Sequence, residues 1–552
     1  MKYKFFNLLI IIGLGSATFM VSCKKQIDDA YLNPNAFVVE PIESILPSVI
    51  GGFSAFNSSA GGGYGLQADG ILLGRYIQYW GSQTAGENYG EMGGTISSDN
   101  TGSIWGAVYY GHGQNVNRII EWGTQQQKWD YVGVAWAIRA WGWLQLTNEY
   151  GDAILQQAFN TSLQQFKYDS SSLFYDSCRT ICFRALSFLN RTDGAVSQKN
   201  LAIGDAYFYN GDVNKWKKFV YGTLARSYND LTNKTIYTTN GYADSAIKYA
   251  SLAMSVNADN ATSKFAGGNS SPVNSYYGPY RGNVGTIRQG GYIADLMSGV
   301  NSLAFTGVLD PRAPYMLREN SNGTYKGFTP WLGTSLLSGT NDYPQNFWGN
   351  SVASSTGAPT IDNSRYIFQN TAEYPIMTAS EMQLIIAESY LRKGNAASAL
   401  TAYTNAISLN FDMLTTNYST NIPAASIITG TSKAAYLSNP AVVPVSSKLT
   451  LTHIMLQKYI ALYGWGVHET WTDMRRYHYV DLDPATGNQV YAGFITPPTT
   501  PVNYLLSTNN GKLVYRCRPR YNSEYLYNVP ELTRIGAKNL DYNTYECWFS
   551  QK

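Results

Sequence analysis

Charged residues are scarce in this chain. Only 14% of its 552 residues are Asp, Glu, Lys or Arg, whereas a typical globular domain has about a quarter. The first 22 residues hold two of the 40 basic residues, Lys2 and Lys4, so 38 basic and 37 acidic residues remain beyond them, a net charge of +1. This balance provides no basic surface for phosphate backbones, which argues against a nucleic-acid partner.

Histidine is scarce too, and its four positions, 112, 453, 468 and 478, are scattered. His468-Glu469 begins the helical zinc-protease motif, but Thr472 stands where the second His is required. No G-x-S-x-G nucleophile motif occurs. The sequence therefore predicts no catalytic residue, no metal site and no cofactor. The 37 carboxylates still leave room for a glycosidase pair, which needs only two carboxylates at the right separation.

The five cysteines are too few for a disulfide scaffold in a chain of this length. Cys178 and Cys182 lie one helical turn apart and are expected to be buried free thiols. Cys517 and Cys547 could pair, and the sequence leaves that pairing open.

The N-terminus has the pattern of an export signal. Lys2 and Lys4 precede an apolar run over 5–14, which is too short to span a membrane, so we expect a cleaved signal. Its end, Val21-Ser22-Cys23, resembles a bacterial lipoprotein signal, in which the lipidated first residue would be Cys23. The alternative is a plain signal with an incidental cysteine. The lipoprotein interpretation divides the chain into a signal peptide (1–22), a lipidated tether (23–47) and a folded domain (48–552).

The clearest helical pattern lies in residues 381–409. Its residues recur at the spacing of a tetratricopeptide repeat: Ala387, Tyr390, Gly394, Ala399, Tyr403 and Ala406. Gly394 can end the first helix in a left-handed conformation, and Asn395 can cap the second. The alternative is an ordinary helical hairpin. Helical periodicity also covers 66–80, 104–146, 173–189, 213–229, 243–254 and 448–463. The sequence therefore predicts a mostly α protein.

Residues 255–370 break this pattern, because Gly, Ser, Asn, Pro and aromatic residues dominate and no long helix is indicated. A long irregular segment inside a compact domain is usually functional. Aromatic rings in loops can stack on the apolar faces of sugars. The predicted ligand-binding residues are Trp80, Tyr89, Tyr277, Tyr280, Arg281, Trp331, Trp348 and Arg365. Trp80, Trp331 and Trp348 are the expected stacking platform; the alternative is that each ring packs beneath its own loop.

Several landmarks in fixed order carry a family resemblance over nearly the whole chain. They are Cys23, Asn33-Pro34-Asn35-Ala36, Tyr150-Gly151-Asp152, Tyr209-Asn210-Gly211-Asp212 with Trp216 and Phe219, Glu381, Ala387-Glu388, Gln457-Lys458, Trp471, Arg475-Arg476, and the Arg520 to Glu524 turn with Asn528. In this order they resemble the SusD/RagB-type nutrient-binding outer-membrane lipoproteins of Bacteroidetes. Asn522 departs from the pattern, since relatives often have Pro there.

The resemblance implies a SusD-like fold, an α-helical scaffold of tetratricopeptide-type hairpins with a loop-rich ligand-binding face. It also implies a cell-surface lipoprotein, held in the outer membrane by its lipid, that works with a SusC-like TonB-dependent transporter in nutrient uptake. The expected ligand is a glycan or oligosaccharide, and the protein is not expected to be an enzyme. The first alternative is peptide capture with the same kind of transporter. A less favoured alternative is a surface glycoside hydrolase.

Overall fold

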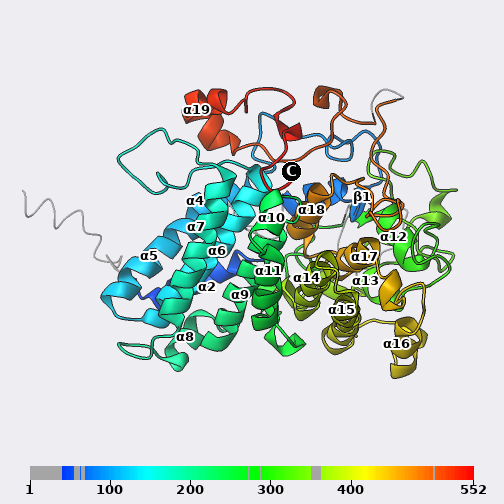
Figure 1. Cartoon of the computed structure of the whole chain (residues 1–552), viewed down its shortest axis with the longest axis horizontal. Coiled ribbons are helices and arrows are strands. Elements are labelled where there is room, and N and C mark those ends of the chain that lie inside the picture. The colour runs from blue at the N-terminus through cyan, green and yellow to red at the C-terminus, as the bar shows by residue number, and fades with distance from the viewer. Residues whose placement is uncertain are drawn as a thin grey trace, which may run out of the picture.

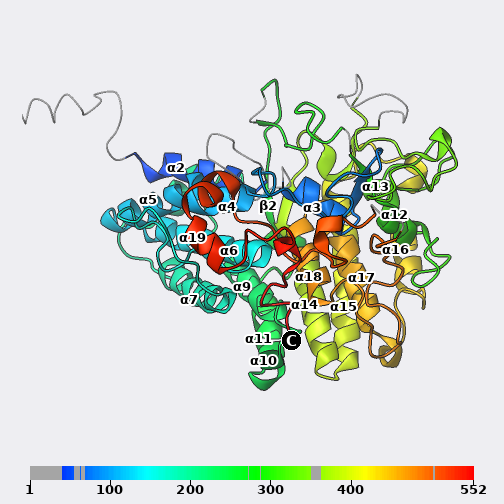
Figure 2. The same ribbon diagram turned by 90° about the horizontal axis from the view of Figure 1, so that it is seen from above.

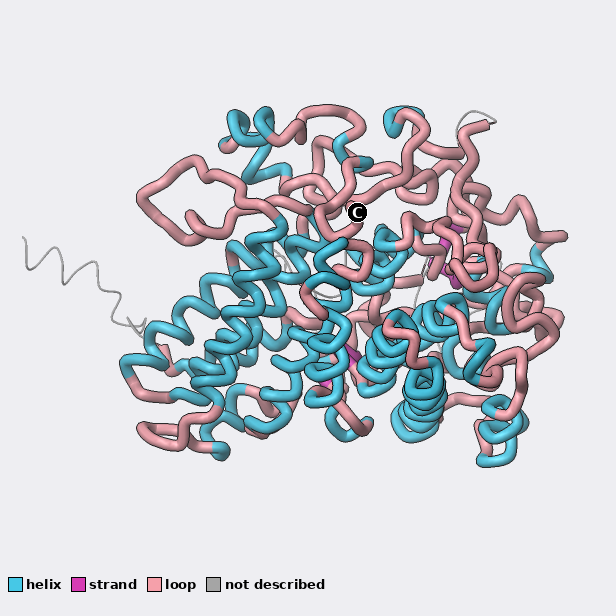
Figure 3. The backbone as a smooth tube through the Cα atoms, in the orientation of Figure 1, coloured by secondary structure: helices cyan, strands magenta, loops and turns pink. Residues whose placement is uncertain are grey.

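Helices form most of the regular structure, and long loops cover one side of them (Figures 1 and 3). The computed structural model describes residues 40–54, 63, 69–270, 273–285, 287–349, 362–500 and 504–552. The predicted signal peptide, Cys23 and residues 24–39 lie outside these ranges. The expected mostly α fold class is confirmed. Within the described ranges, no helix combines the length and apolar character that crossing a membrane requires.

Most of the strands lie inside or beside the loop-rich segment, and the helices lie mainly before and after it. The helices are α2 (Ile42–Gly51), α3 (Ile71–Tyr76), α4 (Ser103–Tyr109), α5 (Gly111–Gln125), α6 (Trp129–Tyr150), α7 (Ser171–Leu189), α8 (Gln198–Gly204), α9 (Val213–Asn229), α10 (Thr235–Thr239), α11 (Tyr242–Leu252), α12 (Gly291–Ser298), α13 (Ala313–Met316), α14 (Ala379–Arg392), α15 (Ala396–Asn417), α16 (Gly430–Leu437), α17 (Leu451–Ala461), α18 (Val467–Arg476) and α19 (Val529–Arg534). The strands are β1 (Trp80–Ser82), β2 (Ala261–Ser263), β3 (Ile287–Gln289) and β4 (Tyr374–Met377).

The predicted helical hairpin is formed by α14 and α15, which lie antiparallel and side by side (Figure 2). Gly394 joins them with a φ of +75°, and the Asn395 side chain accepts a hydrogen bond from the Ser398 N–H. Ala387 and Ala399 are fully buried at the contact. Their single methyl groups let the two helix backbones approach closely, which is what the alternation of small residues in the sequence predicts.

The turn before α9 also forms as expected. Asn210 and Gly211 both have positive φ, 52° and 81°, a conformation that Asn and Gly tolerate best. Asp212 then caps the helix, since its Oδ1 accepts from the backbone N–H groups of Asn214 and Lys215.

Two sequence expectations about the N-terminal third are wrong. Residues 42–47, the end of the predicted tether, belong to the folded domain, because they form most of α2 and Ile42 and Leu46 are fully buried. In the described part of the 66–80 pattern, residues 69–80, the α-helix is the short α3. The chain reverses at Gln78, whose φ is +59°, and enters β1 at Trp80.

Two small antiparallel sheets tie the loop-rich segment to the rest of the chain. Strand β1 pairs with β3, with Trp80 opposite Gln289 and Ser82 opposite Ile287. Strand β2 pairs with β4 through a bulge beside Ala261. In the described part of 255–370 the longest helix is α12, with eight residues, so the prediction of an irregular segment is confirmed.

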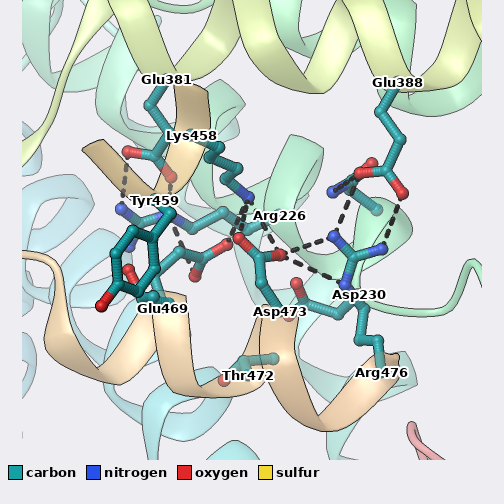
Figure 4. A network of polar contacts seen from close by, with 12 residues as sticks. Arg226, Asp230, Glu381, Glu388, Lys458, Tyr459, Glu469, Thr472, Asp473 and Arg476 are labelled. Atoms are coloured by element: carbon teal, nitrogen blue, oxygen red, sulfur yellow. Dashed lines mark hydrogen bonds and ion pairs between the residues drawn. The ribbon is translucent and has the colours of Figure 1, made fainter. Parts of the chain in front are cut away.

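A network of buried charged side chains joins α9, α14, α17 and α18 (Figure 4). Arg226 donates to both carboxylate oxygens of Glu381, at 2.6 and 2.8 Å. Lys458 lies 3.3 Å from a Glu469 oxygen and 2.9 Å from an Asp473 oxygen. Glu381 and Lys458 are among the landmarks of the family resemblance. These landmarks therefore position the scaffold helices and do not face solvent.

Opposite charges in this network set its ionisation. Burial by itself raises the pKa of Glu388, but Arg476 and Arg392 outweigh burial and hold that pKa far below its usual range. Burial raises the pKa of Asp230 from 3.8 to about 8, with Glu469 adding to the shift. At neutral pH Asp230 therefore keeps a proton.

Candidate ligand-binding site

The predicted aromatic platform does not stand exposed. Trp80 and Trp348 are fully buried, and Trp331 is nearly so. The Trp80 indole N–H donates to the Ile71 carbonyl at 2.8 Å, and its ring lies where a side chain at Gly74 would otherwise be. The Trp348 indole N–H donates to the Tyr277 carbonyl at 2.8 Å. The expected exposure of these rings is wrong, because the loops have little regular structure and use the large rings as their own core.

Three other predicted residues are buried as well. The Tyr277 ring stacks on Tyr374 with centroids 5.2 Å apart, and Tyr89 packs against Tyr76. Arg365 pairs with Glu319 at 2.8 Å and donates to two backbone carbonyls. These contacts place the three side chains inside the loops, away from solvent.

Tyr280 and Arg281 are the predicted residues that reach solvent. Tyr280 is 48% exposed, and its hydroxyl donates to the Asn269 carbonyl at 2.7 Å. The Arg281 guanidinium lies 5.4 Å from the centre of the Tyr276 ring. Ligand binding by any of the eight residues stays a prediction.

The loop-rich segment does form a groove, at residues that sequence reasoning missed. Two cavities of about 570 and 510 Å³ lie against α12 and share Asp295 and Val300. The first extends along 323–329 and 336–337, and the second along 301–303 and 489–496. We call these two cavities together the groove. Their combined size matches that of a ligand longer than one ring.

Close backbone contacts build the wall of the groove. Gly327 packs directly on Gly290: a Cβ atom added to Gly327 would lie 2.2 Å from the Gly290 carbonyl group. The Phe328 N–H donates to the Gln289 carbonyl at 3.0 Å, and the Gly291 N–H donates to the Phe328 carbonyl at 3.0 Å. The 323–329 loop is thereby fixed to the end of β3 and the start of α12, which places Asp295 beside it.

Asp295 is the carboxylate of the groove. It is half-buried, and in the described part of the chain its side chain makes no hydrogen bond or ion pair. Burial raises its pKa to about 6, and nearby Lys326, which pairs with Asp342 at 2.7 Å, lowers it slightly. A free, half-buried carboxyl that titrates near neutrality can accept or donate a hydrogen bond to a ligand.

Aliphatic side chains, and not aromatic ones, line most of the apolar surface of the groove. Val300 is 69% exposed and Leu336 is 70% exposed, with Leu303, Leu309 and Ile495 also exposed. Gathered exposed apolar side chains commonly mark a binding surface. The sequence signal for Asp295 was available, since it is a lone acid in an apolar stretch, Tyr292-Ile293-Ala294-Asp295-Leu296. The 489–496 wall comes from distant sequence and carried no local signal.

Other polar clusters do not offer a metal or redox site within the described residues. No group of three His, Cys, Asp or Glu side chains there is arranged to hold a metal ion. Cys178, Cys182, Cys517 and Cys547 are buried free thiols, so the sequence interpretation of the first two is confirmed and the open Cys517–Cys547 pair is not formed.

Comparison with known proteins identifies the family. A SusD-like family model, described as "Starch-binding associating with outer membrane", matches residues 61–496. The chain belongs to the SusD-like family. No curated protein matches this chain.

Solved structures share the SusD-like fold at low sequence identity. A SusD/RagB family protein from Bacteroides thetaiotaomicron is 20% identical with a TM-score of 0.65, over 93% of this chain and 99% of its own. A SusD homologue from Bacteroides fragilis is 15% identical with a TM-score of 0.67, over 92% and 100%. A chitin-binding SusD homologue from Flavobacterium johnsoniae is 16% identical with a TM-score of 0.59, over 92% and 98%. The likeness covers 92–93% of this chain and nearly all of each neighbour, and it concerns the fold.

Proposed function

We propose that this SusD-like protein captures an oligosaccharide nutrient at the cell surface and delivers it to a TonB-dependent transporter. The observation that supports this most is the groove, which lies in the loop-rich segment and has a free carboxyl at its centre. The family description names starch, and a structural neighbour binds chitin. Sugars offer hydroxyls to Asp295 and apolar C–H faces to the aliphatic walls.

One feature of the groove favours a second candidate, peptide capture. Val300, Leu309 and Leu336 are aliphatic, and aliphatic walls suit side chains of a peptide as well as sugar faces. A peptide would use its amino groups on Asp295. The two ligand classes therefore predict different responses to the loss of this negative charge.

Hydrolysis of a glycan is not favoured in the groove. Glycosidases of the common kind need two carboxylates flanking the bond. Among the described lining residues of both cavities, Asp295 is the single carboxylate. We therefore propose binding and delivery without chemistry.

The ligand class is tested by calorimetric titration of neutral oligosaccharides and of peptides into the wild-type chain and Asp295→Asn. Capture of a neutral glycan predicts saccharide binding that changes little between low and high salt, because no ion pair supports it. Peptide capture predicts binding that weakens with salt and collapses in Asp295→Asn. If neither library binds, the proposed function is wrong.

Anchoring is tested separately, with Cys23→Ala. The thioether to the lipid needs the Cys23 thiol, so this variant should leave the outer membrane and appear in the soluble fraction of cells. A Ser22→Thr variant keeps the thiol and serves as the control. A Cys23→Ala protein that remains in carbonate-washed outer membranes would contradict the lipid anchor.

A further inference from the structure

A smaller cavity lies far from the groove along the longest axis of the molecule. Its volume is about 190 Å³, and it lies between α4, α5 and the connection from α6 to α7, whose loop is at the upper left of Figure 1. Helix α12, beside the groove, lies at the opposite side in both views (Figures 1 and 2). We call this cavity the aromatic pocket, because its walls include Trp105, Tyr109, Tyr110, Phe159 and Phe166.

A tight junction between α4 and α5 presents two of these rings. Gly113 touches the Val108 carbonyl so closely that a Cβ atom would lie 1.7 Å from its oxygen. The chain can therefore turn sharply between the helices, with Tyr109 and Tyr110 at the corner. The Tyr109 hydroxyl donates to the Ile154 carbonyl at 2.5 Å, which fixes that ring against the α6–α7 connection.

The opposite wall holds Phe159 in a demanding backbone conformation. Its φ is +64°, in the left-handed region that bulky residues rarely adopt. The Arg139 guanidinium lies 4.8 Å from its ring centre, and the Tyr109 and Phe159 ring centres are 6.4 Å apart. Strained backbone of this kind persists where surrounding structure enforces it, and it concentrates at binding sites.

The rim of the pocket is polar and uncharged. Gln114, Asn160 and Thr161 are exposed there. In the described part of the chain, neither the Asn160 side-chain nitrogen nor the Thr161 hydroxyl makes a hydrogen bond within the protein. These groups remain available to a ligand.

The part of the pocket wall that the structure describes offers no cation. Its described lining contains no Lys or Arg, and the nearby Arg520 is engaged, 3.0 Å from Asp99 and 5.3 Å from the Tyr110 ring centre. Glu524 forms part of the buried wall, and its carboxylate accepts from the Tyr168 hydroxyl at 2.8 Å. A carboxyl in the wall disfavours an anionic ligand, and the uncharged rim suits a neutral one.

We propose that the aromatic pocket is a second saccharide subsite, which binds one neutral sugar ring. Rings supply faces for sugar C–H groups, and the amide and hydroxyl rim supplies partners for sugar hydroxyls. The volume is below the ~300 Å³ at which sites for drug-sized ligands begin, so it holds a single ring. The choice of ligand class rests on the proposed function, but the pocket shares no residue with the groove.

Monosaccharides separate the pocket from the groove. Glucose, galactose, mannose, xylose and N-acetylglucosamine are presented one at a time to the full chain, and binding is measured by saturation-transfer NMR and calorimetry. Tyr110→Ala removes a ring that is 40% exposed, so the fold should persist, as circular dichroism can check. We expect at least a tenfold loss of monosaccharide affinity, whereas Tyr110→Phe should bind like the wild type. Asn160→Ala should weaken binding by a smaller factor without touching any ring.

The outcomes distinguish the two sites. The proposal predicts that a groove variant, Val300→Arg, keeps monosaccharide binding and that Tyr110→Ala loses it. If Tyr110→Ala binds monosaccharides like the wild type, or if the wild type binds none of the five, the pocket proposal is overturned. If Val300→Arg then still abolishes oligosaccharide binding while Tyr110→Ala leaves it unchanged, this result supports the groove as the binding site without a second subsite.

Discussion

Arg476 and Glu388 form a two-point ion pair between α18 and α14. Arg476 Nη1 lies 2.8 Å from Glu388 Oε1, and Nη2 lies 3.0 Å from Oε2, with both side chains removed from solvent. The Tyr477 hydroxyl also donates to this carboxylate, at 2.5 Å. The helical hairpin is thus joined to the C-terminal helices by charge as well as by apolar packing.

Glu388→Gln should therefore destabilise the protein strongly. The change leaves the Arg476 guanidinium buried with one carboxylate partner fewer, and breaking a buried pair in this way costs about 3–5 kcal/mol. Denaturant unfolding followed by circular dichroism measures the cost. Asp244→Asn is the matched control, because it removes a carboxylate from the exposed Asp244–Lys393 pair on the same group of helices and should cost no more than about 1 kcal/mol. Equal losses of stability in the two variants would show that the buried Arg476–Glu388 pair contributes no more than the exposed pair.

Asp230 should make stability depend on pH. Burial raises its pKa from 3.8 to about 8, so between these values the folded state holds a proton that the unfolded state has released. Stability contributed by this residue is therefore lost as pH rises through that window. Asp230→Asn carries no titrating group and should be more stable than the wild type at pH 8 and above, by at least about 1 kcal/mol, the value of one pKa unit. Unfolding curves at pH 5, 7 and 8.5 test this, and parallel pH profiles for the two proteins would contradict it.

The hairpin contact can be overpacked at one position. Ala399 is fully buried between α14 and α15, so Ala399→Leu forces three extra carbon atoms into a filled space. The expected loss is about 1–3 kcal/mol in the free energy of unfolding. Asn405→Leu adds an apolar group to the exposed face of the same helix and should have little effect. An unchanged melting temperature in Ala399→Leu would mean that the helices are not in close contact there.

The scaffold could be predicted from sequence because its signals are local. The Gly394-Asn395 pair and the alternating alanines specify α14 and α15 within thirty residues, and Asn210 to Asp212 specify the start of α9. Glu381 and Lys458 are identified in the sequence only as family landmarks, by their order along the chain. Their role as buried partners appears only when four helices come together (Figure 4).

The binding surface could not be predicted in the same way. Trp80 and Trp348 have the loop context of exposed rings, yet Trp80 is buried beside the distant Tyr463 ring, and Trp348 donates to the distant Tyr277 carbonyl. The groove around Asp295 combines α12 with residues 489–496. The hydrophobic periodicity of each segment does not show which distant segments come into contact. Burial of a loop ring depends on what folds over it, which a local pattern does not encode.

The central claim is that the groove around Asp295 captures the saccharide, and Val300→Arg tests it most directly. Val300 lies in both cavities and is 69% exposed, so an arginine there should fill the groove and pair with Asp295 without disturbing the core. Ile203→Arg makes the same change at a 61% exposed position on α8 and is the control. Calorimetric titration with an oligosaccharide that the wild type binds should show at least a tenfold loss of affinity for Val300→Arg and none for Ile203→Arg. Wild-type affinity in a folded Val300→Arg protein would contradict the assignment of the groove.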